Sequence, residues 1–296
     1  MKSLHKYMRA IGFSNFKDRK ELQKLITNVI IEGTERNYTS NGKETLLAEF
    51  CKDFGTSIGI AVCGEFDNED KFTYDYYFPY LRGMNISSEE DVSLERHAAQ
   101  ESYAGVCDDV RMGVSIIFYL QNMIPYVKAK NSGTLPIRGT TLTLSALSLK
   151  GTIMMAINKS EKDLMKNKQV SMNRSQLLNA ARKGDENAIE SLTLDDMDTY
   201  TAISKRIQKE DVFSLVDTYF MPYGVECDQY SILGEILDCS LIKNGLTEED
   251  VYLMTINCND MIFDLCINKE DVYGEPGVGR RFKGTIWMQG YINFPN

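Results

Sequence analysis

The chain has 296 residues, of which 43% are hydrophobic and 25% are charged, and its formal net charge is −9 at pH 7. These values are typical of a folded globular protein of about two domains. No run approaches the roughly 20 apolar residues that a membrane-spanning helix needs, and the N-terminus lacks the apolar core of a signal peptide. We therefore expect a cytoplasmic protein with no membrane partner.

The seven cysteines are scattered, odd in number and free of any Cys-x-x-Cys pair. Most of them fall inside apolar runs, which indicates buried free thiols in a reducing compartment. Cys227, Cys239, Cys258 and Cys266 are spaced by 12, 19 and 8 residues, which matches no zinc ribbon. We expect no metal.

The first 80 residues predict a helix followed by three strands. Residues 18–32 place four apolar side chains on one helical face, and Gly33 follows where a helix commonly ends; these side chains are Leu22, Leu25, Ile26 and Val29. Strands are expected at 44–53, 57–65 and 71–80, with a polar hairpin loop at 66–70. The third strand is rich in aromatic residues.

The middle of the chain is harder to assign. Residues 88–103 fit either a helix or an extended segment. Residues 109–130 have a helical spacing of apolar side chains, and Pro125 should kink or end that helix. Two strands at 140–149 and 151–157 are expected to form a hairpin that turns at Lys150-Gly151.

The C-terminal third predicts a helical connector and then an all-β segment. Residues 158–174 are polar and lysine-rich, and three short helices are expected between 174 and 207. Five strands are expected at 212–220, 229–239, 251–257, 261–267 and 281–294. Short strands in such close succession are typical of a small closed barrel, either OB-like or SH3-like.

These elements predict an α+β fold. We expect an N-terminal antiparallel sheet with flanking helices at 1–158, a helical connector at 159–211 and a small β-barrel domain at 212–296. The order of elements in the first part is similar to that of the dimeric chaperones of type III secretion, which bind extended polypeptide segments.

The last strand is the strongest candidate for a contact surface. Its apolar side chains alternate with a second set that combines cations and the only tryptophan; this set includes Arg281, Lys283, Trp287 and Tyr291. Cations and aromatic rings on one face suit the binding of single-stranded nucleic acid. A tryptophan at a domain interface explains the same pattern with fewer assumptions, and we favour it. The aromatic strand adds Tyr74, Tyr76 and Phe78 as candidate binding residues.

Charge is unevenly distributed along the chain. Residues 112–183 carry eleven Lys and Arg against two Asp and Glu, whereas residues 184–279 carry five against 21. The basic segment 128–183 could bind a polyanion. Packing of oppositely charged blocks inside one molecule explains the asymmetry equally well and suits the acidic total better.

The densest group of ligand-type side chains is His97, Glu101, Asp108 and Asp109. If residues 92–103 formed a helix, His97 and Glu101 would share one face, and the four side chains could hold a divalent metal as in a hydrolase. A structural interpretation requires less: the two aspartates cap a following helix and His97 is a surface residue.

No cofactor is expected. The glycine-rich loop at 274–279 precedes a strand and lacks the Gly-Lys-Ser/Thr of a phosphate-binding loop.

Six stretches of the sequence resemble one family. They are residues 5–13 (HKYMRAIGF), 95–97 (ERH), 101–105 (ESYAG), 139–147 (GTTLTLSAL), 210–228 (EDVFSLVDTYFMPYGVECD) and 279–284 (GRRFKG). Over nearly its full length the chain resembles a family of cytoplasmic proteins from anaerobic clostridia that is labelled a domain of unknown function. The resemblance implies a bacterial cytoplasmic setting and no activity.

Together these observations favour a non-enzymatic cytoplasmic protein that binds a protein or peptide partner and self-associates. Two alternatives remain: nucleic-acid binding through the barrel and the segment 128–183, and a metal-dependent hydrolase at the His97 group.

Overall fold

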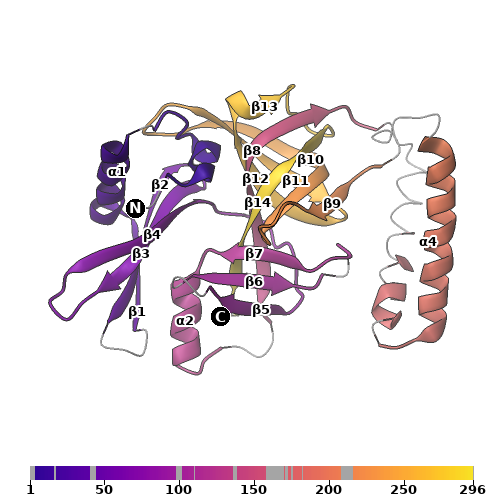
Figure 1. Ribbon diagram of the computed structural model, residues 1–296, viewed down its shortest axis with the longest axis horizontal. Coiled ribbons are helices and arrows are strands. Elements are labelled where there is room, and N and C mark those ends of the chain that lie inside the picture. The colour runs from indigo at the N-terminus through magenta and orange to yellow at the C-terminus, as the bar shows by residue number, and fades with distance from the viewer. Residues whose placement is uncertain are drawn as a thin grey trace.

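The structure, a computed structural model, contains two β-sheets and few helices (Figure 1). It describes residues 4–16, 18–40, 45–97, 102–109, 111–135, 139–157, 170, 173–174, 176–181, 183–207 and 216–295. Among these residues no helix is both long enough and apolar enough to cross a bilayer.

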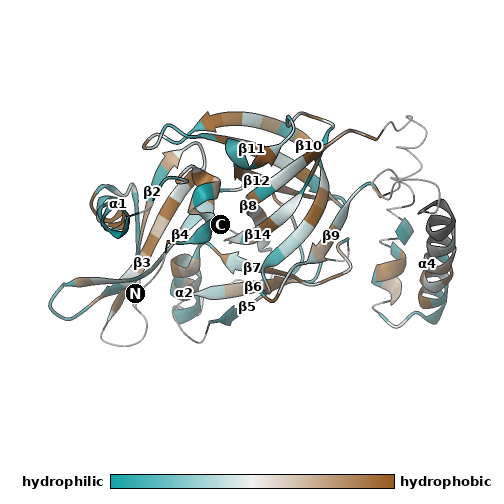
Figure 2. Ribbon diagram, turned by 45° about the horizontal axis from the view of Figure 1, so that its top comes forward, coloured by the Kyte–Doolittle hydropathy of each residue, from teal (hydrophilic) through white to brown (hydrophobic). Residues whose placement is uncertain are grey.

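The first sheet is antiparallel, with the strand order β1-β2-β3-β4. Its strands are β1 (Glu35–Ser40), β2 (Leu46–Gly55), β3 (Ile58–Phe66) and β4 (Phe72–Leu81). The last three confirm the predicted strands, and the β3–β4 loop is hydrophilic, as the run Asp67-Asn-Glu-Asp70 predicts (Figure 2). β1 was not predicted.

Helix α1 (Arg19–Glu32) covers one face of this sheet and confirms the predicted helix. Asp18 begins it, because its carboxylate accepts a hydrogen bond from the backbone N–H of Lys20 at 3.1 Å. The expected apolar stripe is buried: Leu22, Leu25, Ile26 and Val29.

A five-stranded closed barrel forms the centre of the second sheet. Its strands are β8 (Thr141–Met154), β12 (Met261–Asn268), β11 (Asp250–Cys258), β10 (Gln229–Lys243) and β14 (Arg281–Asn293). They pair in that order, and β14 pairs back onto β8 to close the ring. The apolar side of β14 lies in its core, where Phe282, Ile286 and Met288 are fully buried.

Short strands extend the barrel sheet. β7 (Ile116–Leu120) pairs in parallel with β14 and is followed outward by β6 (Tyr103–Cys107) and β5 (Val92–Arg96). β9 (Tyr219–Pro222) pairs with β10, and β13 (Val272–Tyr273), which follows the short 3-10 helix η2 (Lys269–Asp271), pairs with β8. The segment that fitted either helix or strand therefore contains a strand.

Two central predictions are wrong. Residues 109–130 do not form one helix: β7 is followed by α2 (Met123–Asn131), and Pro125 lies in the first turn of α2, where a missing N–H is tolerated. Residues 140–157 do not form a hairpin, because β8 continues as one strand through Lys150-Gly151.

The barrel also differs in membership from the one predicted. β8 completes it, although this strand lies on the N-terminal side of the boundary expected at residue 158. α4 (Glu186–Ile207) lies within the region of the predicted connector and is one continuous helix where the sequence predicts two of the three short helices, at 185–192 and 194–207. Residues 158–169 lie outside the described residues.

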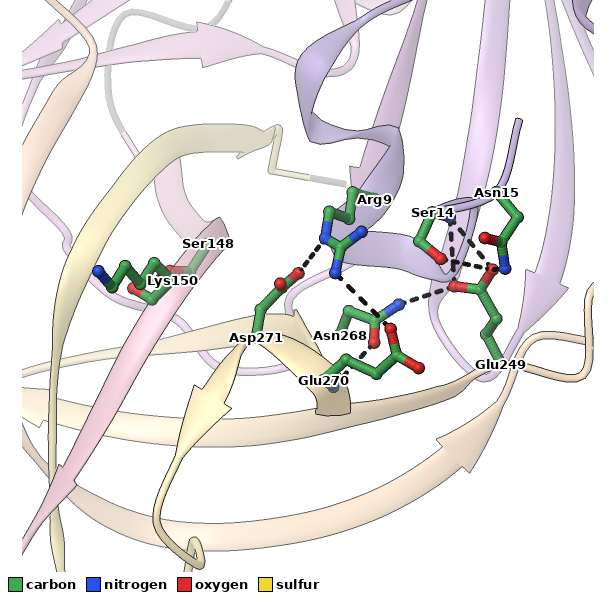
Figure 3. Close-up of polar contacts among 9 residues, drawn as sticks. All are labelled: Arg9, Ser14, Asn15, Ser148, Lys150, Glu249, Asn268, Glu270 and Asp271. Atoms are coloured by element: carbon green, nitrogen blue, oxygen red, sulfur yellow. Dashed lines mark hydrogen bonds and ion pairs between the residues drawn. The ribbon is translucent and has the colours of Figure 1, made fainter. Parts of the chain in front are cut away.

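The N-terminal segment is attached to the barrel by polar contacts (Figure 3). From the 3-10 helix η1 (Lys6–Ile11), Arg9 donates to Asp271 at 2.6 Å. Glu249 accepts hydrogen bonds from the backbone and hydroxyl groups of Ser14 and from Asn268. These contacts place η1 and the residues that follow it against the barrel, and the first sheet and the barrel share one buried cluster.

Candidate functional site

A row of polar side chains crosses the first sheet on the face opposite α1. Lys52 of β2 points toward α1, where its ammonium group binds Asn28. Side chains alternate between the two faces of a strand, so Glu49, three residues before Lys52, points to the opposite face. Strand register places Asn37, Glu49, Cys63 and Tyr76 side by side across β1, β2, β3 and β4. A carboxylate in the centre of a buried sheet face is unusual.

The row is connected by hydrogen bonds. Asn37 Nδ2 donates to Glu49 Oε1 at 3.2 Å, and the Cys63 thiol donates to Glu49 Oε2 at 3.8 Å. Cys63 is hydrogen-bonded to Tyr76, and Tyr76 to Tyr119 of β7. The two sheets are thus joined by a continuous polar line.

A pocket opens beside this row, where the first sheet meets α2, β14 and the end of β7. Its empty volume, with the open mouth included, is about 430 Å³. Every strand of the first sheet contributes to the wall: Glu35, Asn37, Glu49, Cys51, Ala61, Phe78, Tyr80 and Arg82. Gln121, Asn122, Pro125 and Tyr291 form the opposite side. We call this the Glu49 pocket.

The carboxyl of Glu49 is the least solvated charged group in the pocket. Glu49 is 3% exposed. Burial raises the pKa of its carboxyl from 4.5 to about 7, and the nearby Glu35 charge makes a smaller contribution in the same direction. Within the described residues its hydrogen-bond donors are the Asn37 amide and thiols, and none of them carries a charge. A buried carboxylate without a cation is costly.

Arg82, the cation in the pocket wall, is engaged elsewhere. Its Nη1 binds Glu35 at 2.8 Å, and its Nε lies 3.6 Å from Asp53. Its guanidinium carbon lies 5.0 Å from the centre of the Tyr80 ring. Burial works against its charge, but the Glu35 carboxylate holds the pKa of Arg82 above its usual range.

Tyr80 needs the glycine opposite it. Tyr80 pairs with Gly59, and its hydroxyl donates to Asp53 one strand further at 2.6 Å. A Cβ on Gly59 would overlap the Tyr80 hydroxyl and ring edge. Gly59 therefore allows the ring to lie across β3 and complete the wall beneath Arg82.

The thiols near the pocket are unsuited to nucleophilic catalysis. Burial raises the pKa of both Cys51 and Cys63, and the Glu49 charge raises it further. Both thiols are therefore protonated at neutral pH, whereas a reactive cysteine must be a thiolate. As the sequence predicts, the seven cysteines are free, and five of them are buried.

The structure brings together two of the predicted binding residues. Phe78, from the aromatic strand, and Tyr291, from the terminal strand, both line the Glu49 pocket. Tyr291 is 41% exposed at its mouth, Tyr76 lies buried in the polar row, and Tyr74 is half-buried nearer the β3–β4 loop.

The other predicted residues of the terminal strand are covered. Trp287 is 5% exposed, stacks on Tyr7 of η1 at 5.1 Å between ring centres, and donates to Asp228 at 2.7 Å. Arg281 is 7% exposed and donates to the backbone carbonyls of Met155 and Val216. Lys283 is half-buried. Neither Trp287 nor Arg281 is therefore available to bind a nucleic acid.

The side chains of the alternative metal site are not brought together where the structure describes them. His97 pairs with Ser102 at one end of the β5–β6 ladder, and its Nδ1 lies 2.7 Å from the Ser102 hydroxyl. Asp108 and Asp109 follow the other end, about 20 Å away at roughly 3.3 Å per residue. Asp109 binds Arg111 and Ser88, and Glu101 lies outside the described residues. Among the residues with defined positions, no three His, Cys, Asp or Glu side chains are grouped to hold a metal.

The sequence contained one signal for this site that the pattern analysis passed over. Along 47–51, Glu49 alternates in phase with Leu47 and Cys51, so a carboxylate stands between two apolar side chains on one strand face. Its covering elements, α2 and the end of β14, lie far away in the chain, so no local pattern predicts them.

Comparison with known proteins identifies the family. The chain belongs to the family described as "Domain of unknown function, E. rectale Gene description (DUF3881)", whose model matches residues 8–290. No curated protein matches the chain, and no solved structure does. The match spans both sheets and includes the residues that line the Glu49 pocket except Tyr291, which follows its last residue.

Proposed function

We propose that this protein is a non-enzymatic binding protein that takes part of a polypeptide partner into the Glu49 pocket. The observation that carries the proposal is the Glu49 carboxyl itself, which is buried at the wall of an open pocket and has no cationic partner among the described residues. Titratable groups perturbed by burial concentrate at functional sites, and a pocket with a few convergent polar groups is the usual place for a ligand.

The shape of the pocket favours a side chain as its occupant. The cavity within the open space of the pocket is only about 60 Å³, well below the roughly 300–1,000 Å³ of sites for drug-sized ligands, so one side chain suits it better than a whole small molecule. The exposed ring of Tyr291 at the rim offers apolar contact to the segment that would carry the inserted side chain. The protonated thiols favour binding over thiol catalysis.

A peptide-selection experiment tests the proposal. Random displayed peptides are selected on the wild-type protein and in parallel on Ala61→Met, which fills the pocket from β3 with a flexible side chain. Peptides enriched only by the wild-type protein are then titrated against Tyr291→Ala, which opens the rim without touching the buried row. We expect at least tenfold weaker binding by both variants. Equal enrichment by the wild-type and filled proteins would contradict a role for the pocket.

Self-association is a second candidate function, favoured by the surface of α4. Ile189, Leu194 and Met197 are each about half exposed or more on this helix. Exposed apolar side chains mark an interface between chains when they form a contiguous patch, and we propose that these three do so on α4. Light scattering across a concentration series should show a larger species that Leu194→Glu abolishes; a monomer at all concentrations would exclude it.

A further inference from the structure

We infer that the Glu49 pocket is specific for a positively charged group, and that the partner inserts a lysine or arginine side chain whose cationic end meets the Glu49 carboxylate. The inference rests on the proposed function and names the chemistry of the inserted residue.

The charge balance of the pocket favours a cation. Three carboxyls, those of Glu35, Glu49 and Asp53, lie in or beside its wall, against the single guanidinium of Arg82. That guanidinium is already bound to Glu35 and lies near Asp53, so the part of the chain that the structure describes supplies no counter-ion to Glu49. An anionic ligand would meet an excess of like charge, so the pocket excludes it.

The remaining wall suits the same ligand. Phe78, Tyr80 and Tyr291 place aromatic rings around the pocket. Aromatic faces attract cations, and their apolar surface accommodates the methylene stem of a long basic side chain. Entry of an ammonium or guanidinium would give the buried carboxylate the charged hydrogen-bond donor that the described residues do not supply.

Binding should also depend on pH, because the ligand pairs only with the ionised carboxyl. The titratable or charged groups that face Glu49 come from every neighbouring strand: Glu35 from β1, Cys51 from β2, Cys63 from β3, Tyr76 and Tyr80 from β4, Arg82 after β4, and Tyr291 from β14; α2 contributes the uncharged Pro125. Burial raises the pKa of the Glu49 carboxyl itself to about 7, so this group changes its charge within the pH range of the test.

The test uses small probes of matched shape. N-acetyl-lysine amide and N-acetyl-arginine amide carry the charge, and N-acetyl-norleucine amide carries a similar stem without it. Each is titrated into the wild-type protein, Glu49→Gln and the control Glu65→Gln, which removes the same charge from a position on β3 outside the pocket. The Glu49 carboxyl carbon is followed by NMR.

We expect at least one charged probe to bind the wild-type protein and the control at least tenfold more tightly than norleucine does. Glu49→Gln should abolish the difference. The charged probe should lower the titration midpoint of the Glu49 carboxyl, and at pH 7 each binding event should release about half a proton. Proton release should vanish at pH 9, where the carboxyl is already ionised.

Equal binding of the three probes, or a preference that survives Glu49→Gln, would overturn the inference. Either result would leave the proposed function intact if the selected peptides still bound the wild-type protein more tightly than Ala61→Met. Selected peptides that bind through the pocket but lack basic residues would likewise overturn the inference and leave the proposed function intact. Failure of the peptide selection would instead count against the proposed function.

Discussion

The burial of Glu49 predicts that its neutral analogue is more stable than the natural protein at alkaline pH. Glu49→Gln keeps the size and shape of the side chain and removes the charge. The folded-state pKa of about 7 lies above the ordinary 4.5. The stability that this group contributes is therefore fully present below pH 4.5 and is lost as the pH rises through 7.

The magnitude follows from the same two values. At 1.36 kcal/mol for each pH unit, the difference between 4.5 and about 7 corresponds to about 3 kcal/mol of unfolding free energy. Glu49→Gln should thus match the wild-type protein at pH 4.5 and exceed its stability by up to about 3 kcal/mol at pH 9.

Urea denaturation under reducing conditions would measure this difference. Trp287 is the only tryptophan and is buried, so its fluorescence should report unfolding. Subtracting the variant's curve from the wild-type curve isolates Glu49 from other titrating groups, and Glu65→Gln should show no such pH-dependent gain. Parallel curves from pH 5 to pH 9, or a variant that is less stable at pH 9, would show that Glu49 is solvated or paired and would refute the reasoning.

Three further predictions concern contacts that support the fold. Gly59→Ala should destabilise the fold by about 1–3 kcal/mol, because its methyl group overlaps the facing tyrosine; unchanged urea denaturation would contradict this. Trp287→Phe should cost about 1–3 kcal/mol, because it keeps an aromatic ring but leaves the Asp228 carboxyl without its indole donor; circular dichroism can follow its unfolding, and a larger loss is expected for Trp287→Ala. Arg9→Gln should cost no more than about 1 kcal/mol, because water screens its pair with Asp271, and that cost should shrink in high salt; a loss of several kcal/mol would show that the N-terminal segment depends on this pair.

The sequence predicted those parts of the fold that depend on local pattern. β2, β3 and β4 follow one another through short polar loops, so alternation and loop composition suffice to locate them. α1 has a capping aspartate and an uninterrupted apolar stripe. The last four barrel strands were also placed correctly for the same reason.

The wrong predictions fall where contacts with distant parts of the chain, rather than the local sequence pattern, explain which residue is present. The sequence pattern predicts a turn at Gly151, yet a Cβ there would collide with the ring of Phe282 on the adjacent strand β14. The glycine marks close packing, and the strand continues through it. The helical spacing of apolar residues continues across both β7 and α2, so it predicts a single helix. Ile116–Leu120 nevertheless consists of β-branched, aromatic and leucine residues, which suit a strand.

The Glu49 pocket could not be predicted for a related reason. Its wall combines β1, which carries no apolar pattern, with α2 and the end of β14, which lie more than 70 and 240 residues away from Glu49. Phe78 and Tyr291 were selected for separate reasons, on different strands. Only the closure of the sheets shows that both belong to one pocket.

The position of Glu49 links stability to the proposed function. The fold gains nothing from a carboxylate there, because a neutral side chain of equal size could occupy the row and remove about 3 kcal/mol of destabilisation at alkaline pH. Proteins keep such destabilised groups where a ligand makes use of them, so that a stabilising substitution removes function. If a basic side chain is the ligand, its pairing with the ionised carboxyl relieves this destabilisation, and the relief adds to the free energy of binding. Glu49→Gln should therefore be at once the more stable protein at pH 9 and the one that no longer distinguishes lysine from norleucine.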